Sequence, residues 1–535
     1  MNRLAAALAA VTLIRLVVAA TAPLAPDETY YWVWSHALAA GYLDHPPMVA
    51  LWIRAGTFLV GQTALGLRLL GPLAAALASW MLFDAGRVLF PGTKTGVAAA
   101  LLLNATLLLG VGTVIMTPDS PLLFFWTATL WATARIAAGG PAAWWLAAGL
   151  FGGLALDSKY TALFLWIGIG LWVLLVPSVR PWLRRWQPWA ACAIGLLLFA
   201  PVLDWNATHD WVGFIKQGSR VEDWHPTRAL GFLAELIGGQ IGLATPMVWA
   251  LCMAGLWVAG WQAVQRRDPA WSLLAALSVP PALVFLQHVT GDRVQGNWPA
   301  IIYPALTIAA GALTMGQSVQ RRRPMITSSG DASRPPIVMA GEGPPSTPLP
   351  KPPPRGVDGS PPPAMTELSN HASPELFGRY LTSAITLGYG ITALAYVQAT
   401  TGLIPLPPRL DPIAMRLAGW DSLARQVQVF GNATGAAYIA ADGYALASEL
   451  AWWMPPGAAV AGPDERWTLT TLPVARIAGT PGLLIRDVRR AEAPDPARWT
   501  DAQRIGTVTR GGIPGGDFAV YHVTSVGDLA GLPAR

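Results

Sequence analysis

Two acidic motifs lie close together near the amino terminus. The first is Pro26-Asp27-Glu28-Thr29-Tyr30-Tyr31, and the second, Gly41-Tyr42-Leu43-Asp44-His45-Pro46-Pro47-Met48, places Asp44 17 residues after Asp27. A positioned carboxylate can accept the proton of a hydroxyl or amine nucleophile during its attack. An acidic helix cap explains Asp27 alone equally well. The second motif favours a functional site, because each proline locks its own φ and restricts the residue before it.

Three more charged residues stand at the ends of apolar runs. Asp119 follows Thr117-Pro118, Lys159 follows Asp157-Ser158, and Arg293 precedes Gly296-Asn297-Trp298-Pro299. Ionisable side chains near a bilayer are costly, so a group of them at one set of helix ends indicates function. A lysine at a helix end can also extend its charge toward the interface, and this alternative stays open for Lys159.

Composition predicts that membrane helices position these residues. Of 535 residues, 53% are hydrophobic and 12% are charged, and the mean hydropathy is +0.42, which lies outside the range of soluble domains. Apolar runs of about 18 or more residues recur, and each is long enough to cross a hydrocarbon core of about 30 Å. Backbone groups in lipid must be satisfied within the segment, and the alternation typical of barrel strands is absent. We therefore expect an all-α polytopic membrane protein.

We expect about 11 transmembrane helices, over residues 4–25, 66–86, 96–115, 121–138, 143–157, 161–177, 188–204, 243–262, 270–288, 298–317 and 377–400. If the amino terminus is cytoplasmic, the cytoplasmic turns carry Arg87, Lys94, Arg135, Arg180, Arg184, Arg185, Arg266, Arg267 and Arg321 to Arg323, as the positive-inside rule requires. The net charge of +6 is then explained by orientation in the membrane, and a nucleic-acid partner is not indicated. All the candidate residues fall on the extracytoplasmic face.

Two long outer connections separate these spans. In the first, residues 26–65, we expect two amphipathic stretches at the interface, Tyr30 to Ala40 and Met48 to Val60. Its aromatic residues suit an interfacial aromatic belt, namely Tyr30, Tyr31, Trp32 and Trp34. The second connection, residues 205–242, mixes aromatic residues with charged ones and with histidines.

The carboxyl-terminal part of the chain has a different composition. Thirteen prolines between residues 324 and 364 predict that 324–376 is a disordered cytoplasmic linker between the region 1–323 and a last span at 377–400. Residues 401–535 are more polar and predict a small extracytoplasmic α/β domain. Its expected strands are Ala436 to Ala440, Trp467 to Leu472, Leu483 to Val488 and Phe518 to Val523, and its expected helix is Ala445 to Trp453.

Five motifs in this order resemble one family. PDETYYWVWS, GYLDHPPM, TPDSPLLFFW, LDSKYTALF and GNWPA are similar to motifs of bacterial GT-C glycosyltransferases of the family 39 and aminoarabinose-transferase kind, over about the first 310 residues. The resemblance implies a GT-C-like helical bundle, a polyprenyl-phosphate-linked sugar donor and an essential aspartate in the first outer loop. Matched residue by residue, that aspartate is Asp27, and Asp119 fits the second acidic position.

The resemblance also implies roles for the other candidates. Asp27 would act as general base toward the acceptor, with Asp119 as the second catalytic acid residue. Because the leaving polyprenyl phosphate is a stable anion, its departure requires no general acid. It requires positive charge, which Lys159 and Arg293 would supply. We expect the remaining substrate contacts from Glu28, Tyr30, Asp44 and His45. Direct attack opposite the phosphate would invert the anomeric centre.

Several alternatives remain at this point. The histidines His36, His45, His209, His225 and His288 have no metal-ligand spacing, so no metal ligand is predicted, although a divalent ion is associated with some family members. Asp27 and Asp119 also match the paired carboxylates of glycoside hydrolases, but a hydrolase does not need so many spans. A transporter or flippase of a lipid-linked sugar is the main alternative, and it should show polar residues in the middle of its spans.

The expected location is the inner (plasma) membrane, with the active site and the carboxyl-terminal domain on the periplasmic side. The acceptor is an envelope molecule, and lipid A, another glycan, a lipid or a protein all agree with the motifs. The sequence identifies neither the sugar nor the oligomeric state.

Overall fold

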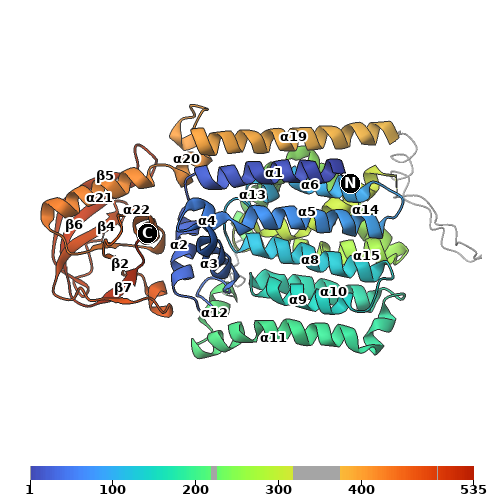
Figure 1. Cartoon of the computed structure of the whole chain (residues 1–535), viewed down its shortest axis with the longest axis horizontal. Helices are drawn as coiled ribbons and strands as arrows, with labels where there is room; N and C mark the ends of the chain where they lie inside the picture. Colours follow the sequence, from blue (N-terminus) through green and yellow to red (C-terminus); the bar gives the residue numbers. More distant parts are fainter. Residues whose placement is uncertain (1, 219–225, 317–373, 491) are drawn as a thin grey trace, which may run out of the picture.

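The chain forms a helical bundle with a smaller mixed domain at one end (Figure 1). The computed structural model describes residues 2–218, 226–316, 374–490 and 492–535. The predicted linker 324–376 lies outside the described residues except for its last three positions. Arg321 to Arg323, and Arg220, Glu222, Asp223 and His225 of the second outer connection, also lie outside them.

The bundle consists of long helices and shorter ones that run roughly side by side (Figure 1). They are α1 (Asn2–Thr21), α5 (Leu70–Leu89), α6 (Thr95–Asn104), α7 (Leu107–Gly110), α8 (Asp119–Ala137), α9 (Trp144–Leu156), α10 (Leu163–Leu175), α11 (Trp186–Thr208), α13 (Pro226–Ala244), α14 (Pro246–Gln265), α15 (Pro269–Ala276), α16 (Val279–His288), α17 (Tyr303–Thr314) and α19 (Pro374–Thr401). The 3-10 segments η1 (Tyr160–Ala162), η2 (Arg180–Arg184) and η4 (Trp298–Ile302) lie between them.

Within the described ranges, six helices are long and apolar enough to cross a membrane, judged by length and composition. They are Arg3–Thr21, Ala64–Leu89, Trp186–Thr208, Pro246–Gln265, Pro269–His288 and Gly378–Thr401. The other predicted spans correspond to shorter or interrupted helices or, for 121–138, to the 19-residue α8, which is not among these six, so the count of about 11 is not confirmed. A helix was also missed, because α13 lies largely within the predicted outer connection 205–242. Its apolar periodicity is weak in the sequence, because an apolar residue, Leu230, is exposed and a polar residue, Gln240, is buried.

The first connection forms α2 (Pro26–His36), α3 (Met48–Val60) and α4 (Ala64–Arg68). Its predicted aromatic belt is wrong, because these rings lie inside the protein. Trp32 and Trp34 are buried, and Tyr30 packs against Tyr444 of the carboxyl-terminal domain with ring centroids 4.4 Å apart. The domain covers α2, so its aromatic face contacts protein and not lipid.

The carboxyl-terminal domain is a seven-stranded mixed sheet with helices packed on it. Its strands are β1 (Ile439–Ala441), β2 (Val460–Gly462), β3 (Val474–Ala475), β4 (Pro481–Asp487), β5 (Trp499–Thr509), β6 (Asp517–Ser525) and β7 (Leu529–Leu532), in the order β3-β7-β2-β1-β4-β6-β5. Only β1 pairs in parallel, with β2 and with β4. The helices of this domain are η5 (Pro408–Leu410), α20 (Pro412–Leu417), α21 (Trp420–Thr434), α22 (Tyr444–Trp453) and η6 (Glu465–Leu469). A further short helix, α12 (Val212–Gly218), lies at the end of the bundle.

The prediction of a small α/β domain agrees with this architecture, but one of its strands is wrong. Trp467 to Leu472 was expected as a strand, and residues 465–469 form η6 instead. Asp464 begins this turn, since its side chain accepts a hydrogen bond from the backbone N–H of Arg466. The apolar residues in this segment are therefore buried by a turn and not by a sheet.

A buried ion pair attaches α2 to the bundle. Both side chains are almost fully buried, and Arg68 Nη2 lies 2.6 Å from Glu28 Oε2. Glu28 also accepts hydrogen bonds from the backbone N–H groups of Ala25 and Met116. Arg68 donates its remaining N–H groups to backbone carbonyls, including that of Ala22. A buried ion is tolerated only with such complete pairing.

A second buried acid joins α2 to the carboxyl-terminal domain. Glu449 on α22 accepts hydrogen bonds from Thr29 Oγ1 at 3.3 Å and from Trp453 Nε1 at 3.0 Å. Burial raises the pKa of Glu449 well above its ordinary value, although Trp453, Thr29 and the charge of Arg510 act in the opposite direction. The folded protein therefore favours the neutral carboxyl group.

Breaking the first pair should destabilise the protein strongly. We expect Arg68→Met to cost about 3–5 kcal/mol, because it leaves the Glu28 carboxylate buried without its cation. Glu28→Gln combined with Arg68→Met should be less harmful than Arg68→Met alone. Thermal unfolding of the purified protein, followed by tryptophan fluorescence, measures both. Asp421→Asn, which removes the exposed pair with Arg425, is the control and should change stability by less than about 1 kcal/mol.

Glu449 should make stability depend on pH. The pKa of Glu449 is higher in the folded protein than in the unfolded chain. Its contribution to the free energy of unfolding is therefore fully present below the unfolded pKa of about 4.3 and is lost as pH rises. Glu449→Gln should therefore raise the melting temperature at pH 8 more than at pH 5. Glu465→Gln, at a highly exposed position, should change neither. Equal effects of Glu449→Gln at both pH values would contradict a neutral Glu449.

Candidate active site

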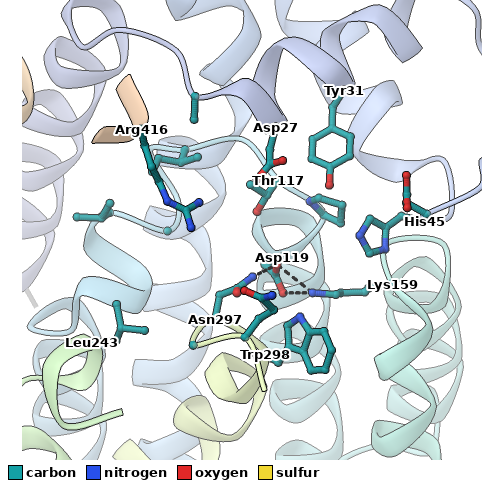
Figure 2. Close-up of a pocket in the computed structure, with 18 of the residues that line it drawn as sticks. Asp27, Tyr31, His45, Thr117, Asp119, Lys159, Leu243, Asn297, Trp298 and Arg416 are labelled. Carbon is teal, nitrogen blue, oxygen red and sulfur yellow. Dashed lines mark hydrogen bonds and ion pairs between the residues drawn. The ribbon is translucent and has the colours of Figure 1, made fainter. Parts of the chain in front are cut away.

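A cavity of about 1020 Å³ lies where the bundle meets the carboxyl-terminal domain. Its centre is polar, with Asp27, Asp119 and Lys159 pointing into it (Figure 2). One wall is apolar and comes from α1, α19 and the segment after α7, and another comes from α10, α13 and α16. The cavity thus has room for a polar group between two surfaces suited to hydrocarbon.

Among the described acids that line the cavity, Asp27 alone has no side-chain partner, whereas Asp44 and Asp119 are both paired. Asp27 lies in the first turn of α2, is half-buried, and has no hydrogen bond or ion pair with any described residue. Figure 2 shows its carboxylate directed into the cavity above Thr117. Burial raises the pKa of Asp27, the charge of Arg416 lowers it, and Glu28 and Asp44 raise it further. A carboxylate with a raised pKa is a better base than an exposed one.

Asp119 lies opposite Asp27 and is fully engaged. Lys159 Nζ lies 2.8 and 3.0 Å from its two carboxylate oxygens, and Asn297 Nδ2 donates to Oδ2 at 2.6 Å. These contacts connect the start of α8, the loop before η1 and the loop before η4 (Figure 2). Three of the motifs noted in the sequence therefore meet here. Asp119 is placed to orient and neutralise Lys159.

Asp44 is held by three side chains from different parts of the chain. Lys216 Nζ lies 2.5 Å from Oδ1, while Tyr30 Oη and Arg466 Nη1 donate to Oδ2 at 2.8 and 3.0 Å. Burial alone raises its pKa, but the hydrogen bond and charge of Lys216 and the charge of Arg466 lower it below the ordinary value. Asp44 is therefore a fixed anion that joins the first loop to the carboxyl-terminal domain.

The other candidates occupy different positions. His45 lines the cavity beside Tyr31, with ring centroids 6.3 Å apart. Arg293 also lines it, but its guanidinium pairs with Glu235 of α13 at 2.7 Å. Glu28 does not line the cavity and is fully buried in its pair with Arg68, so the geometry replaces its predicted substrate contact with a structural role.

The sequence reading missed the contribution of the carboxyl-terminal domain. Tyr444 and Arg466 line the cavity, and the Arg466 guanidinium lies 4.2 Å from the centroid of the Tyr444 ring. Arg416 of α20 lines it as well. These residues have ordinary sequence neighbours and lie more than 380 positions after Asp27, so only the fold brings them to the site.

Asp44 and His45 are the first-loop residues to examine as ligands of a divalent ion. Both oxygens of Asp44 already have partners, and within the described parts of the chain no group of three or more His, Cys, Asp or Glu residues is arranged to hold a metal ion. The divalent ion associated with some family members therefore has no fitting ligand set around Asp44 and His45.

Sequence comparisons relate the chain to known glycosyltransferases. Residues 44–205 match the family of dolichyl-phosphate-mannose-protein mannosyltransferases. The chain is 31% identical over 316 residues to the lipid A galacturonosyltransferase RgtD of Rhizobium johnstonii, an alignment that covers 57% of this chain and 64% of the relative, which is less than two thirds.

Solved structures show the same fold. The crystal structure of ArnT from Cupriavidus metallidurans bound to undecaprenyl phosphate superimposes with a TM-score of 0.60, at 14% identity and over 97% of both chains. Its apo form gives a TM-score of 0.59 at 15% identity. The chain therefore has an ArnT-like fold, and its resemblance to the bacterial GT-C glycosyltransferases is confirmed.

Proposed function

We propose that this protein is an integral membrane glycosyltransferase that transfers a sugar from a polyprenyl phosphate to an envelope acceptor. The observation that carries the proposal is the unpaired Asp27 carboxylate at the polar centre of a cavity with apolar walls. The lipid-linked donor is supported by the relatives, since the ArnT structure contains undecaprenyl phosphate. A transporter or flippase gains no support from a specific observation in the described residues.

The reaction would proceed by direct displacement. The acceptor oxygen attacks the anomeric carbon while its proton passes to an Asp27 carboxylate oxygen, and the bond from that carbon to the phosphate oxygen breaks. The polyprenyl phosphate departs as an anion, so the products carry the same atoms and charge as the reactants. One displacement inverts the anomeric centre. In this proposal Asp119 keeps Lys159 in place in the cavity, and Tyr30 and Asp44 shape the cavity wall.

We propose lipid A as the acceptor to test first. RgtD, the relative described above, is named for lipid A, and the apolar walls of the cavity suit a lipid acceptor. The same name makes polyprenyl-phosphate galacturonic acid the first donor to test. Location in the inner membrane, with the cavity and the carboxyl-terminal domain on the periplasmic side, is part of this proposal.

Asp27→Asn should abolish transfer without preventing folding. Loss of a general base reduces turnover by about 10²- to 10⁴-fold, and Asn preserves the size of the side chain. Transfer of labelled sugar is measured in proteoliposomes. Asp204→Asn, an exposed acid near the end of α11 that does not line the cavity, is the matched control. Unchanged transfer in Asp27→Asn would exclude this base, and movement of the donor lipid without a new glycosidic bond would favour the flippase.

The rate of transfer should also depend on the charge state of Asp27. Because burial raises its pKa, transfer should fall on acidification with a midpoint above about 3.9, the ordinary value for aspartate. The charged groups that act on it are Arg416 from α20, Glu28 from α2 and Asp44 from the first loop. A pH profile of kcat/KM checks this expectation, and a midpoint at or below 3.9 would contradict it.

A further inference from the structure

Arg416 differs from every other described cation that lines the cavity. Arg68 pairs with Glu28, Lys159 with Asp119, Arg293 with Glu235 and Arg466 with Asp44. Arg416 makes no ion pair with a described residue, and its side chain is exposed in the cavity. Figure 2 shows its guanidinium reaching into the cavity from the side opposite Lys159. An anion can therefore bind Arg416 without displacing an acid.

The backbone beneath Arg416 is held firmly from two directions. Asp411 begins α20 by accepting hydrogen bonds from the N–H groups of Ile413 and Ala414, and Gln398 of α19 donates to its other oxygen at 2.6 Å. These contacts fix the start of α20 relative to the last helix of the bundle.

The end of α20 is held by an arginine of the sheet domain. Arg510 donates to the carbonyl oxygens of Met415 and Ala418, and its guanidinium lies 3.9 Å from the centroid of the Trp420 ring. It also reaches the carbonyl oxygen of Arg416 at 3.4 Å, and that oxygen accepts from Trp420 as well. Contacts with other described residues therefore involve the backbone of Arg416 and not its guanidinium.

The surroundings of Arg416 suit a lipid that carries an anionic group. The wall of the same cavity includes small apolar residues of α1 and α19, among them Val18, Ala395 and Ala399, and Gln398 of α19 holds the start of α20. Across the cavity, Arg416 faces Asp27 closely enough for its charge to lower the pKa of that carboxyl group. A hydrocarbon chain between α1 and α19 would therefore bring its polar end between the guanidinium and the proposed base.

We propose that Arg416 binds the phosphate group of a lipid substrate whose hydrocarbon chain lies along α1 and α19. A guanidinium can donate two parallel hydrogen bonds to phosphate oxygens, which suits both a polyprenyl phosphate and the phosphates of lipid A. We favour the polyprenyl phosphate as the source of the bound phosphate group, because this leaving group departs as an anion next to Asp27 and requires a nearby cation. This inference rests on the proposed function for its substrate class.

Binding measurements on Arg416→Gln test the inference directly. The full-length protein in nanodiscs is titrated with undecaprenyl phosphate, and separately with lipid A, each compared with its dephosphorylated form. We expect affinity for one phosphorylated lipid to fall about 10- to 100-fold, as for loss of hydrogen bonds to a charged group, with no change for the dephosphorylated form. The lipid affected identifies the source of the phosphate. Unchanged affinity for both phosphorylated lipids would overturn the inference.

Two further variants separate a specific contact from a general effect. Arg409→Gln removes an exposed arginine of the same segment that does not line the cavity, and it should bind like the unmodified protein. Arg416→Lys retains the charge but loses the planar fork, so its affinity should lie between those of the unmodified protein and Arg416→Gln. Equal losses in Arg409→Gln and Arg416→Gln would overturn the inference.

A kinetic readout distinguishes this inference from the proposed function. Removing the Arg416 charge should move the acid limb of the pH profile to higher pH, because that charge lowers the pKa of Asp27. If Asp27→Asn still binds undecaprenyl phosphate but does not transfer, and Arg416→Gln loses that binding, both proposals hold. If neither the unmodified protein nor any variant transfers sugar, and only Arg416→Gln loses lipid binding, the glycosyltransferase proposal fails and the phosphate site stands.

Discussion

The buried pair of Glu28 and Arg68 determines where the two candidate acids lie. Glu28 follows Asp27 directly, and one of its oxygens accepts the N–H of Met116, three residues before Asp119. One carboxylate therefore fixes both the first turn of α2 and the loop that enters α8. In a medium of low dielectric constant this carboxylate is stable only with all its hydrogen bonds made. That requirement makes the positions of Asp27 and Asp119 interdependent, although 92 residues separate them in sequence.

The carboxyl-terminal domain completes the site as well as covering it. Its α22 buries the aromatic face of α2, and its η6 brings Arg466 to Asp44. The segment between α19 and the sheet supplies Arg416. Since the same domain contacts α2 through Thr29 and Glu449, its position and that of Asp27 cannot change independently. The cavity is therefore a property of the whole chain and not of the helical bundle alone.

Local sequence patterns predicted the parts of the site but not its pairings. Asp27, Asp44, Asp119, Lys159 and Arg293 all line one cavity, as expected from motifs at helix ends. The ion pair of Lys159 with Asp119 and the burial of Glu28 depend on contacts between distant segments, which no local pattern contains. The same reason explains the aromatic residues of α2. Tyr30 and Trp32 are of the residue types found in interfacial belts, and the docking of a separate domain contributes to their burial through Tyr444 and Trp452. Arg416 carried no signal, because a lone arginine after a span is ordinary.

The charges around Asp27 explain how the proposed base and the proposed anionic substrate could share one cavity. Without substrate, Arg416 stabilises the ionised form of Asp27 against the effect of burial. In the proposed complex, a phosphate on Arg416 offsets that positive charge, so the pKa of Asp27 rises and its carboxylate becomes a stronger base. The remaining cations of the cavity are neutralised by Glu28, Asp119, Asp44 and Glu235, and they contribute little to this change. Binding of the donor would thus increase the basicity of Asp27 at the step that consumes the donor.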